Sequence, residues 1–480
     1  MPIRHVRVPD APAALVDGLR RLATRLEVPA RFPDAVLAEA SELAASGPVD
    51  GHRRTDLTDL GFVTIDPPGS TDLDQALYIE RLGAGYRVWY AIADVGAWVR
   101  PGGAIDLEAH RRGQTFYAPT WRIPLHPPEL SEFAASLLAD GRPRPALVWR
   151  IDLDADAQIA DIFLERAIIR SRAKLDYAGV QREIDSGQAS ESLTLLRTVG
   201  RLRQQVEIDR GGVSLDLPEQ EVVADGSEWH LQFRTPLAVE GWNAQISLLT
   251  GISAAQIMLG ADLGMLRTLP PAERRDVEKL RRVAKSLHLA WPRSMSYPDF
   301  VRSLDRSDPD GQAMLNACTL LFRGASYTAI DRDDPGQVSV HAALATHYAH
   351  TTAPLRRLVD RYTGELCADL VTGVAPQSWI IEALGALPDE MATSDRRAKK
   401  FERGIIDFVE ALVLRDHVGQ FFEGTIIDLD DRRPDRGVAS IPRVAVEAPV
   451  AGDGLGLGDE RCLRLVTADL DEGRVLFEPA

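Results

Sequence analysis

The sequence predicts an α+β fold in which a region of strands precedes a region of helices. Between Phe62 and Ile169 apolar and polar residues alternate, and Pro/Gly turns separate the alternating runs. From Pro236 to Gly419 the apolar residues recur instead every three or four positions, which is typical of helices. Strands that come first and helices that follow favour an α+β central domain over an alternating βαβ fold.

The two ends of the chain differ from its centre and predict flanking units. Residues 1–55 form a predicted helical segment, because ALVDGLRRLATRLEV and PDAVLAEASELAAS carry helical spacing before GPVDGH breaks the pattern. Residues 56–419 form the predicted central domain. Residues 420–480 return to short β runs such as EGTIIDLD and RVAVEAPV, whose length and spacing suit a small β-barrel.

Length and composition limit the class of protein. At 480 residues the chain is long enough for two to four domains of about 150 residues. No apolar run approaches the ~20 residues that span a bilayer, and no secretory signal is evident, so we expect no membrane association. Cys318, Cys367 and Cys462 form no C-x-x-C motif, which favours a cytoplasmic protein without a disulfide framework.

The net charge of -16 argues against general attraction to nucleic acid, which favours basic domains. Arginines nevertheless cluster in the runs RPRP, RAIIRSRAK, PLRRLVDR and RRAKKFER. The clusters are consistent with a basic channel inside an acidic protein and equally with solvated helix faces.

The stretch TIDPPGSTDLDQALYIE crowds Asp66, Asp72 and Asp74 into one turn between two predicted strands. Carboxylates this close repel one another, so near neutral pH they take up protons or bind a cation. Their hard oxygens suit magnesium or manganese, which can bind phosphate oxygens and activate water for phosphodiester cleavage. If D-L-D is extended, Asp72 and Asp74 point the same way.

The same turn allows other interpretations. Aspartate is a common turn former, so the turn could simply be solvated. An EF-hand calcium loop needs Gly at its sixth and Glu at its twelfth position, and that pattern is absent. A nucleotidyltransferase also carries Gly-Ser before D-x-D, but Gly69-Ser70 lies too close to Asp72 for the usual spacing.

The turn and several later motifs together resemble the ribonuclease II family of RNB-domain exoribonucleases. The later motifs follow in the family's order, as YAIADVGAWVRPGGAIDLEAHRRGQTFYAP, IPLHPPELSE, IIRSRAKLDYAGV, YAHTTAPLRRLVD and FERGIIDF. The resemblance covers about Leu57 to Gly419. It implies an RNB-type catalytic domain, with an antiparallel sheet and helices, followed by a small OB-like barrel. It further implies magnesium-dependent hydrolysis of single-stranded RNA from the 3′ end to nucleoside 5′-monophosphates.

The resemblance also implies roles for individual residues in the chemistry. Asp66, Asp72, Asp74 and Gln75 occupy the positions of the metal site, and Asp72 and Asp74 are expected to be catalytic. Arg356 matches the family's catalytic arginine. An arginine can stabilise the charge that develops on phosphate in the transition state.

The residues around Arg356 predict how it is positioned. Thr351-Thr352 and Pro354 read as the start of a helix, with a threonine cap and proline in the first turn. A helix N-terminus favours phosphate, so the arginine and the helix would act on the same group.

Three more residues are implied to hold the RNA. Tyr117 and Tyr177 match the aromatic residues that hold the terminal bases, and Glu402 matches a glutamate that contacts the terminal nucleotide. Stacking on aromatic rings is tolerant of sequence, which suits a degradative enzyme. Glu402 lies beside a predicted apolar helix stripe, so it could face inward or merely flank the stripe.

Gln75 departs from the family pattern, which is usually D-x-D-D where this chain has D-L-D-Q. A neutral amide supplies an oxygen but no charge, so magnesium should bind more weakly or one metal ion should be missing. The alternative function is therefore a non-catalytic RNA-binding protein with the same fold.

The flanking units differ from the family as well. About 55 residues precede the acidic turn, too few for the two cold-shock domains that are usual there. The C-terminal stretch is acidic and has few aromatic residues, so it should attract RNA weakly. We expect a monomer that captures RNA less well than a full-length family member, or one that a protein partner assists.

Overall fold

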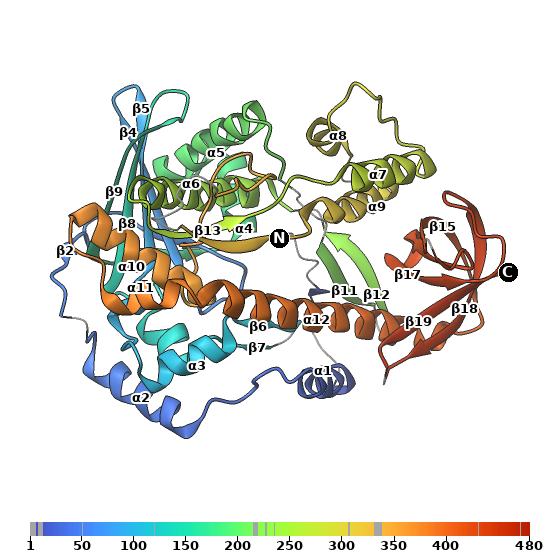
Figure 1. The fold of residues 1–480 in the computed structure, drawn as a ribbon, viewed down its shortest axis with the longest axis horizontal. Coiled ribbons are helices and arrows are strands. Elements are labelled where there is room, and N and C mark those ends of the chain that lie inside the picture. The colour runs from blue at the N-terminus through green and yellow to red at the C-terminus, as the bar shows by residue number, and fades with distance from the viewer. Residues whose placement is uncertain are drawn as a thin grey trace.

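The computed structural model describes residues 6–7, 13–49, 51–119, 121–214, 219–225, 228–234, 236–305, 308–330, 338–430, 432–470 and 472–480. These residues form the predicted α+β arrangement, with a sheet and its helices on one side and a barrel on the other (Figure 1). Across the described ranges, no helix has both the length and the apolar character needed to cross a membrane.

The central sheet is antiparallel in its middle and parallel at its two edges. The alternating runs that predict strands between Phe62 and Ile169 all contribute to it, namely FVTID, ALYIE, YRVWYAIADV, ALVWRIDLD and IADIFLERAIIR. Its strands, in spatial order, are β10 (Ala173–Leu175), β3 (Val63–Ile65), β4 (Gln75–Leu82), β5 (Gly85–Ala93), β8 (Arg144–Leu153), β9 (Ile159–Ile169) and β2 (Thr55–Asp56).

Alternation along the strands gives the sheet two different faces. Large residues such as Tyr90 and Trp149 are buried on the face that packs against helices. These helices are α4 (Tyr177–Asp185), α5 (Glu191–Asp209), α6 (Ala238–Gly260) and α10 (Leu358–Thr372).

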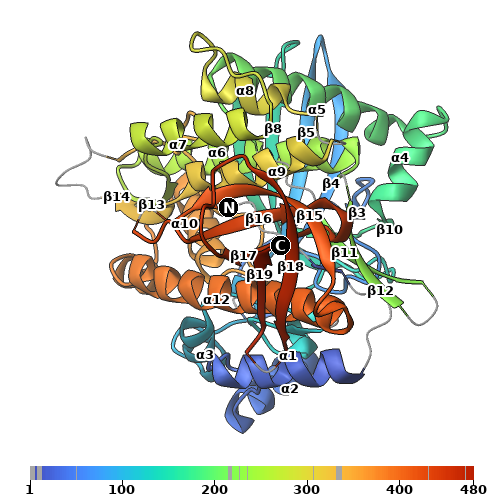
Figure 2. The same ribbon diagram turned by 90° about the vertical axis from the view of Figure 1, so that its right-hand side faces the viewer.

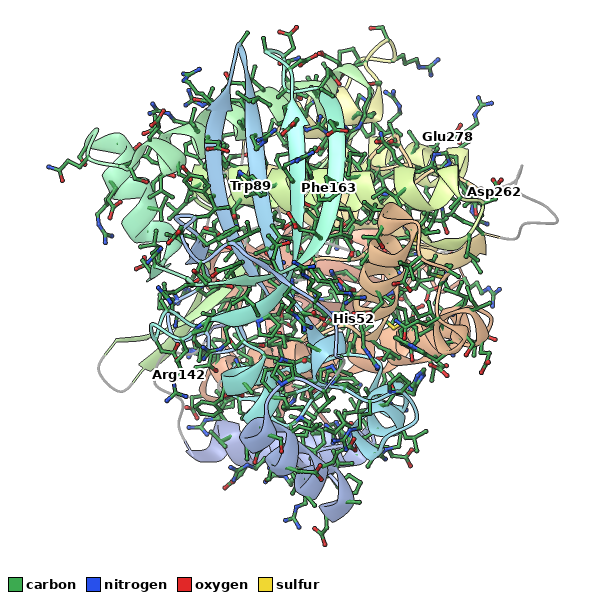
Figure 3. All side chains as sticks on the ribbon, turned by 90° about the vertical axis from the view of Figure 1, so that its left-hand side faces the viewer. His52, Trp89, Arg142, Phe163, Asp262 and Glu278 are labelled. Carbon is green, nitrogen blue, oxygen red and sulfur yellow. The ribbon has the colours of Figure 1, made fainter. Side chains whose placement is uncertain are left out.

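The opposite face has a covered end and an open end. Small residues such as Ala91 and Val148 pack with α2 (Asp34–Ser46) and α3 (Ala104–Arg112). Toward the open end, Figure 3 shows Trp89 and Phe163 on the sheet. The Trp89 indole N–H donates to Glu80 at 2.9 Å, so its polar edge is satisfied there.

Helix α12 (Leu387–Leu414) connects the helical region to the C-terminal barrel (Figure 1). Phe401, Ile405 and Phe408 are buried and belong to the apolar stripe predicted beside Glu402. Helix α1 (Ala13–Arg25) packs against this helix. A Cβ at Gly18 would lie 2.0 Å from the Phe408 ring, so only glycine allows this approach.

The C-terminal residues form the predicted small barrel, which is closed and has five strands (Figure 2). Its strands, in spatial order, are β15 (Phe421–Leu429), β16 (Arg436–Ile441), β17 (Val446–Ala451), β19 (Arg474–Pro479) and β18 (Glu460–Asp469).

The remaining elements connect these parts. A three-stranded sheet joins β1 (Val6–Arg7) to the hairpin of β11 (Glu219–Asp225) and β12 (Glu228–Arg234). Two further pairs are β6 (Phe116–Tyr117) with β7 (Arg122–Ile123), and β13 (Gly264–Thr268) with β14 (Ser326–Ile330). The other helices are α7 (Arg274–Ser286), α8 (Tyr297–Ser303), α9 (Pro309–Ala317) and α11 (Ser378–Leu384).

Candidate active site

The acidic turn lies between β3 and β4, at one end of the central sheet. Asp66 follows β3 directly, and Asp72 and Asp74 precede β4. Leu73 between them is fully buried in the core beneath α2, whereas both aspartates lie within electrostatic range of Arg356. This is the alternation predicted for D-L-D, since neighbouring residues of an extended segment point opposite ways.

Asp74 is the most deeply buried of the three aspartates. Its Oδ1 accepts a hydrogen bond from the Leu355 N–H at 2.7 Å, and its Oδ2 lies 3.2 Å from Arg356 Nε. Burial raises the pKa of Asp74 to about 8, although Arg356 and the Leu355 N–H oppose the shift. The turn is thus joined to a loop that lies far along the chain.

Asp72 is neutralised by an arginine that the sequence motifs did not single out. Arg122 Nη1 lies 2.9 Å from Asp72 Oδ1, and its Nη2 lies 2.9 Å from Glu132 Oε1. The Tyr117 hydroxyl donates to Asp72 Oδ2 at 3.3 Å. Burial still raises the pKa of Asp72, with Arg122 opposing it.

Asp66 makes the fewest direct contacts of the three aspartates. Within the described part of the chain its carboxylate makes no hydrogen bond or ion pair, although Arg356 and Lys174 act on it from a distance. Burial raises the pKa of Asp66 to about 6, and the charge of Asp72 adds to the shift. A cation here would relieve a buried carboxylate that lacks a direct partner.

Gln75 is held by hydrogen bonds on both sides of its amide. Its Nε2 donates to the Thr352 carbonyl at 2.6 Å, and its Oε1 accepts from the Tyr90 hydroxyl at 2.6 Å. The same hydroxyl lies 2.8 Å from Ser247 Oγ on α6. Gln75 therefore links β4, β5 and the loop that carries Arg356.

The three carboxylates fit magnesium by the chemistry of their oxygens. Burial raises the pKa of each, so a cation would offset the cost of their charges. They do not form a ready-made cage. Among the residues that the structure describes, no three Asp, Glu, His or Cys side chains lie close enough to hold one ion. Asp66 and Asp72 are the donors best able to hold magnesium, and binding at Asp72 would compete with Arg122.

The helix expected at Thr351-Thr352 begins later, so that prediction was wrong. Pro354 to Arg356 lie in a turn, and α10 starts at Leu358. The reason is that Arg357, directly before α10, is extended and pairs with Gln114 in a short β-bridge. The Asp360 carboxylate accepts from the Ala353 N–H at 2.7 Å and pairs with Arg357 at 2.8 Å. Arg356 is therefore left on a loop ahead of the helix, with its side chain 40% exposed.

Arg356 and Tyr177 line the same cavity, which has a volume of about 460 Å³. Tyr177 opens α4, and its hydroxyl accepts a hydrogen bond from Asn243 Nδ2 at 3.3 Å. Burial raises the pKa of Tyr177 to about 12. Tyr117 reaches the site from the other side through Asp72, and 38% of its surface is exposed. The structure therefore brings both tyrosines to the aspartates and Arg356.

Glu402 does not line that cavity. It lines a separate one of about 520 Å³ between α12, α7 and the barrel, where burial raises its pKa to about 7. Two turns earlier on α12, Asp395 Oδ2 lies 3.2 Å from Arg267 Nη2, and Arg267 does line the cavity with Arg356. On α12 it is therefore Asp395 that is linked to the predicted catalytic residues.

Sequence reasoning missed Arg122, Tyr90 and the Arg267–Asp395 pair, all of which contact or lie next to the predicted site. Arg122 lies in β7, directly before the motif IPLHPPELSE. Tyr90 lies at an inward position of the quoted run YRVWYAIADV. The signals in the sequence were that Arg122 directly precedes one motif and that Tyr90 is the first residue of another, YAIADVGAWVRPGGAIDLEAHRRGQTFYAP.

Comparison with protein families gives two matches that follow this architecture. Residues 54–372 match the RNB domain, and residues 420–480 match the RNase II-type exonuclease C-terminal S1 domain. Helices α1 and α12 fall outside both stretches.

Curated relatives agree with these matches. The chain is 26% identical to ribonuclease R of Escherichia coli over 430 residues, which are 83% of this chain and 52% of that protein. It is 30% identical to the human exosome complex exonuclease RRP44 over 337 residues, which are 66% of this chain and 34% of that protein. The chain thus spans about half or less of the length of these relatives.

Solved structures share the fold. RNase R of Mycoplasma genitalium, in complex with ribose-methylated single-stranded RNA, matches with a TM-score of 0.84 and 19% identity, covering 98% of this chain and 78% of that one. Yeast Ssd1, described as a pseudonuclease, matches with a TM-score of 0.69 and 18% identity, covering 87% of this chain and 53% of that one.

Proposed function

The chain belongs to the family of RNB-domain exoribonucleases, and from this premise we propose that it hydrolyses single-stranded RNA from the 3′ end, with magnesium, to nucleoside 5′-monophosphates. The observation that carries the proposal is the contact of Asp74 with Leu355 and Arg356. These contacts join residues 281 and 282 positions apart and hold the arginine whose side chain lines the cavity.

Each group in the site has a chemical task in this proposal. Magnesium held by Asp66 and Asp72 would polarise the phosphate and lower the pKa of a bound water. Arg356 presents its half-exposed guanidinium to the cavity, where it can donate to phosphate oxygens as charge develops on them. Asp74 holds Arg356 Nε and so sets the direction of that guanidinium.

Asp74 is also suited to move a proton. Burial raises its pKa to about 8, which is close to cytoplasmic pH, and efficient proton transfer needs a group that titrates near the working pH. Tyr117 and Tyr177 flank the site and offer ring faces for the terminal bases, each worth roughly 1–3 kcal/mol.

A non-catalytic RNA-binding protein is the second candidate, and Gln75 favours it. The amide brings no charge to the site, and its oxygen already accepts the Tyr90 hydrogen bond. Arg122 and Arg356 neutralise Asp72 and Asp74 without any metal. A site of this kind can bind RNA phosphates even if it hydrolyses none.

The deciding experiment incubates the pure protein and the variant Asp74→Asn with a 5′-labelled single-stranded RNA and magnesium or manganese. Asp59→Asn serves as a control, because Asp59 is exposed and lies outside the site. We expect wild type and Asp59→Asn to give a ladder that shortens from the 3′ end with release of 5′-monophosphates, and Asp74→Asn to give none. Tight RNA binding without cleavage in either metal would establish the second candidate.

Three wider expectations from the sequence stay predictions, namely a cytoplasmic location, a monomer and a protein partner that assists RNA capture. Size-exclusion chromatography with light scattering tests the second of these. RNA capture by the chain alone is the subject of the next inference.

A further inference from the structure

A groove of about 1020 Å³ lies between α1, α12 and the turn that follows β18. Figures 1 and 2 both show α1 beside the barrel end of α12. Seven cationic side chains line the groove. Two come from α1, Arg21 and Arg25, and five come from the α12 stretch between Arg396 and Arg403.

The groove is strongly positive in a protein whose net charge is -16. Its acidic lining residues are Asp407 and Glu472, and Asp407 is already 3.5 Å from Arg403. Arg21, Lys399 and Lys400 are exposed, so their charges face solvent at the rim. An excess of cations over acids in one groove costs free energy in the folded state, and a polyanion in the groove would reduce that cost.

Close packing against α12 fixes the position of α1. Gly18 lies against the Phe408 ring, and a Cβ at Gly404 would lie 2.9 Å from the Leu22 side chain. Leu15, Leu19 and Leu22 are buried in one core with Phe408 and the barrel. The two helices therefore hold their cations in a defined arrangement.

The groove continues toward the predicted active site. Lys399, Arg403 and Asp407 line both this groove and the neighbouring cavity of about 520 Å³ that contains Glu402. Farther along α12, Asp395 pairs with Arg267, which lines the cavity of Arg356. One face of α12 thus runs from the cationic groove to the predicted site of hydrolysis.

We propose that this groove binds the phosphodiester backbone of single-stranded RNA upstream of the 3′ end. The proposal rests on the proposed function, because it makes the groove the place where the chain captures its substrate. Lysine and arginine contacts to phosphates carry no sequence information, which suits degradation of any RNA. Phe408, the aromatic residue of its lining, is buried, so binding here should be electrostatic and not by stacking.

The groove also bears on the expectation of weak RNA capture. That expectation rested on the acidic C-terminal stretch and on the short segment ahead of the acidic turn. The short segment instead supplies α1, and α1 with α12 forms a basic surface from residues outside the two stretches matched to known domains. On this proposal the chain captures RNA through its own surface.

The test compares Arg21→Glu/Arg25→Glu with the control Arg81→Glu/Arg201→Glu, which changes the net charge equally. Arg81 and Arg201 are exposed, on β4 and α5, far from α1 in Figure 1. Binding of 5′-labelled single-stranded RNA is measured in EDTA, with short and long oligonucleotides and over a range of salt concentrations. EDTA prevents cleavage, so binding is read independently of hydrolysis.

We expect the groove variant to bind long RNA at least about tenfold more weakly than wild type. The slope of log K against log salt concentration should be less steep by about 1.4, because two phosphate contacts are lost. The groove variant should bind the shortest oligonucleotides as tightly as wild type does. The control variant should bind oligonucleotides of every length as tightly as wild type does. Equal binding of long RNA by both variants would overturn the inference and leave the proposed hydrolysis standing. Conversely, if the groove variant binds long RNA more weakly but the wild-type protein cleaves no RNA, then the groove proposal stands and the proposed hydrolysis is wrong.

Discussion

The side-chain amide of Gln75 donates a hydrogen bond of 2.6 Å to the Thr352 carbonyl, and this contact ties the acidic turn to the loop of Arg356. The amide oxygen accepts from Tyr90 at the same distance, so both ends of the side chain are used. The departure from the family's usual acidic residue therefore comes with a specific structural role. An acid at this position could not donate to a carbonyl while ionised.

Gln75→Glu should accordingly destabilise the protein at pH 8 by about 1–3 kcal/mol, because an ionised carboxylate would face the Thr352 carbonyl. The loss should shrink at pH 5, where a protonated carboxyl can again donate. Urea unfolding at both pH values measures the effect, with Gln188→Glu at an exposed position as the control. An unchanged free energy of unfolding at both pH values would show that the contact with Thr352 contributes nothing.

Asp66→Asn should stabilise the metal-free protein at neutral pH. Burial raises the pKa of Asp66 to about 6, above its ordinary value of 3.8, so the folded state holds this proton more tightly than the unfolded state. The stability of wild type therefore falls as pH rises from about 4 to about 6, whereas Asn has no charge to bury. We expect a gain of about 1–2 kcal/mol at pH 7.5 and a much smaller one at pH 4.

The same pair of proteins reports on magnesium. Wild type should gain thermal stability when magnesium is added, and more so at pH 8 than at pH 6, because the metal displaces protons from the carboxylates. Asp66→Asn should gain less, and Asp59→Asn should behave as wild type. Equal stabilisation of all three proteins by magnesium would place the ion elsewhere.

The fold was largely predictable because strand alternation and helical spacing are local patterns. Tyr90 and Trp149 point into the helix-covered core while Ala91 and Val148 point away, as the alternation requires. The start of α10 was not predictable from its own residues. Threonine and proline precede it, but Arg357 is extended because it pairs with the distant Gln114, and only the folded chain shows that pairing.

The site was predictable to the extent that motifs carry it. Asp72, Asp74, Tyr117, Tyr177 and Arg356 meet in space although the chain separates them widely. Partners outside the family motifs could not be foreseen, since no spacing rule links Arg122 to Asp72. The orientation of Glu402 depended on the rotation of α12, which a residue beside an apolar stripe does not determine.

Gly18→Ala should loosen α1 from α12. The added Cβ would overlap the ring of buried Phe408, and overpacking of this kind costs about 1–3 kcal/mol. Limited proteolysis should then cleave near α1 sooner, and binding of long RNA should weaken together with it. Gly260→Ala is the control, because nothing lies within 4 Å of its Cβ position. Equal protease resistance of both variants would mean that the packing at Gly18 does not hold α1 in place.

Tyr117 and Tyr177 should act through their ring faces and not through their hydroxyls. Stacking is worth roughly 1–3 kcal/mol per base, so Tyr→Ala at either position should raise KM for RNA by about 5- to 150-fold and change kcat little. Tyr→Phe keeps the ring and removes only the 3.3 Å contacts to Asp72 or Asn243, so KM should stay within about twofold of wild type. If Tyr→Phe and Tyr→Ala raise KM equally at one position, then the hydroxyl at that position, through its contact with Asp72 or Asn243, contributes more to RNA binding than stacking does.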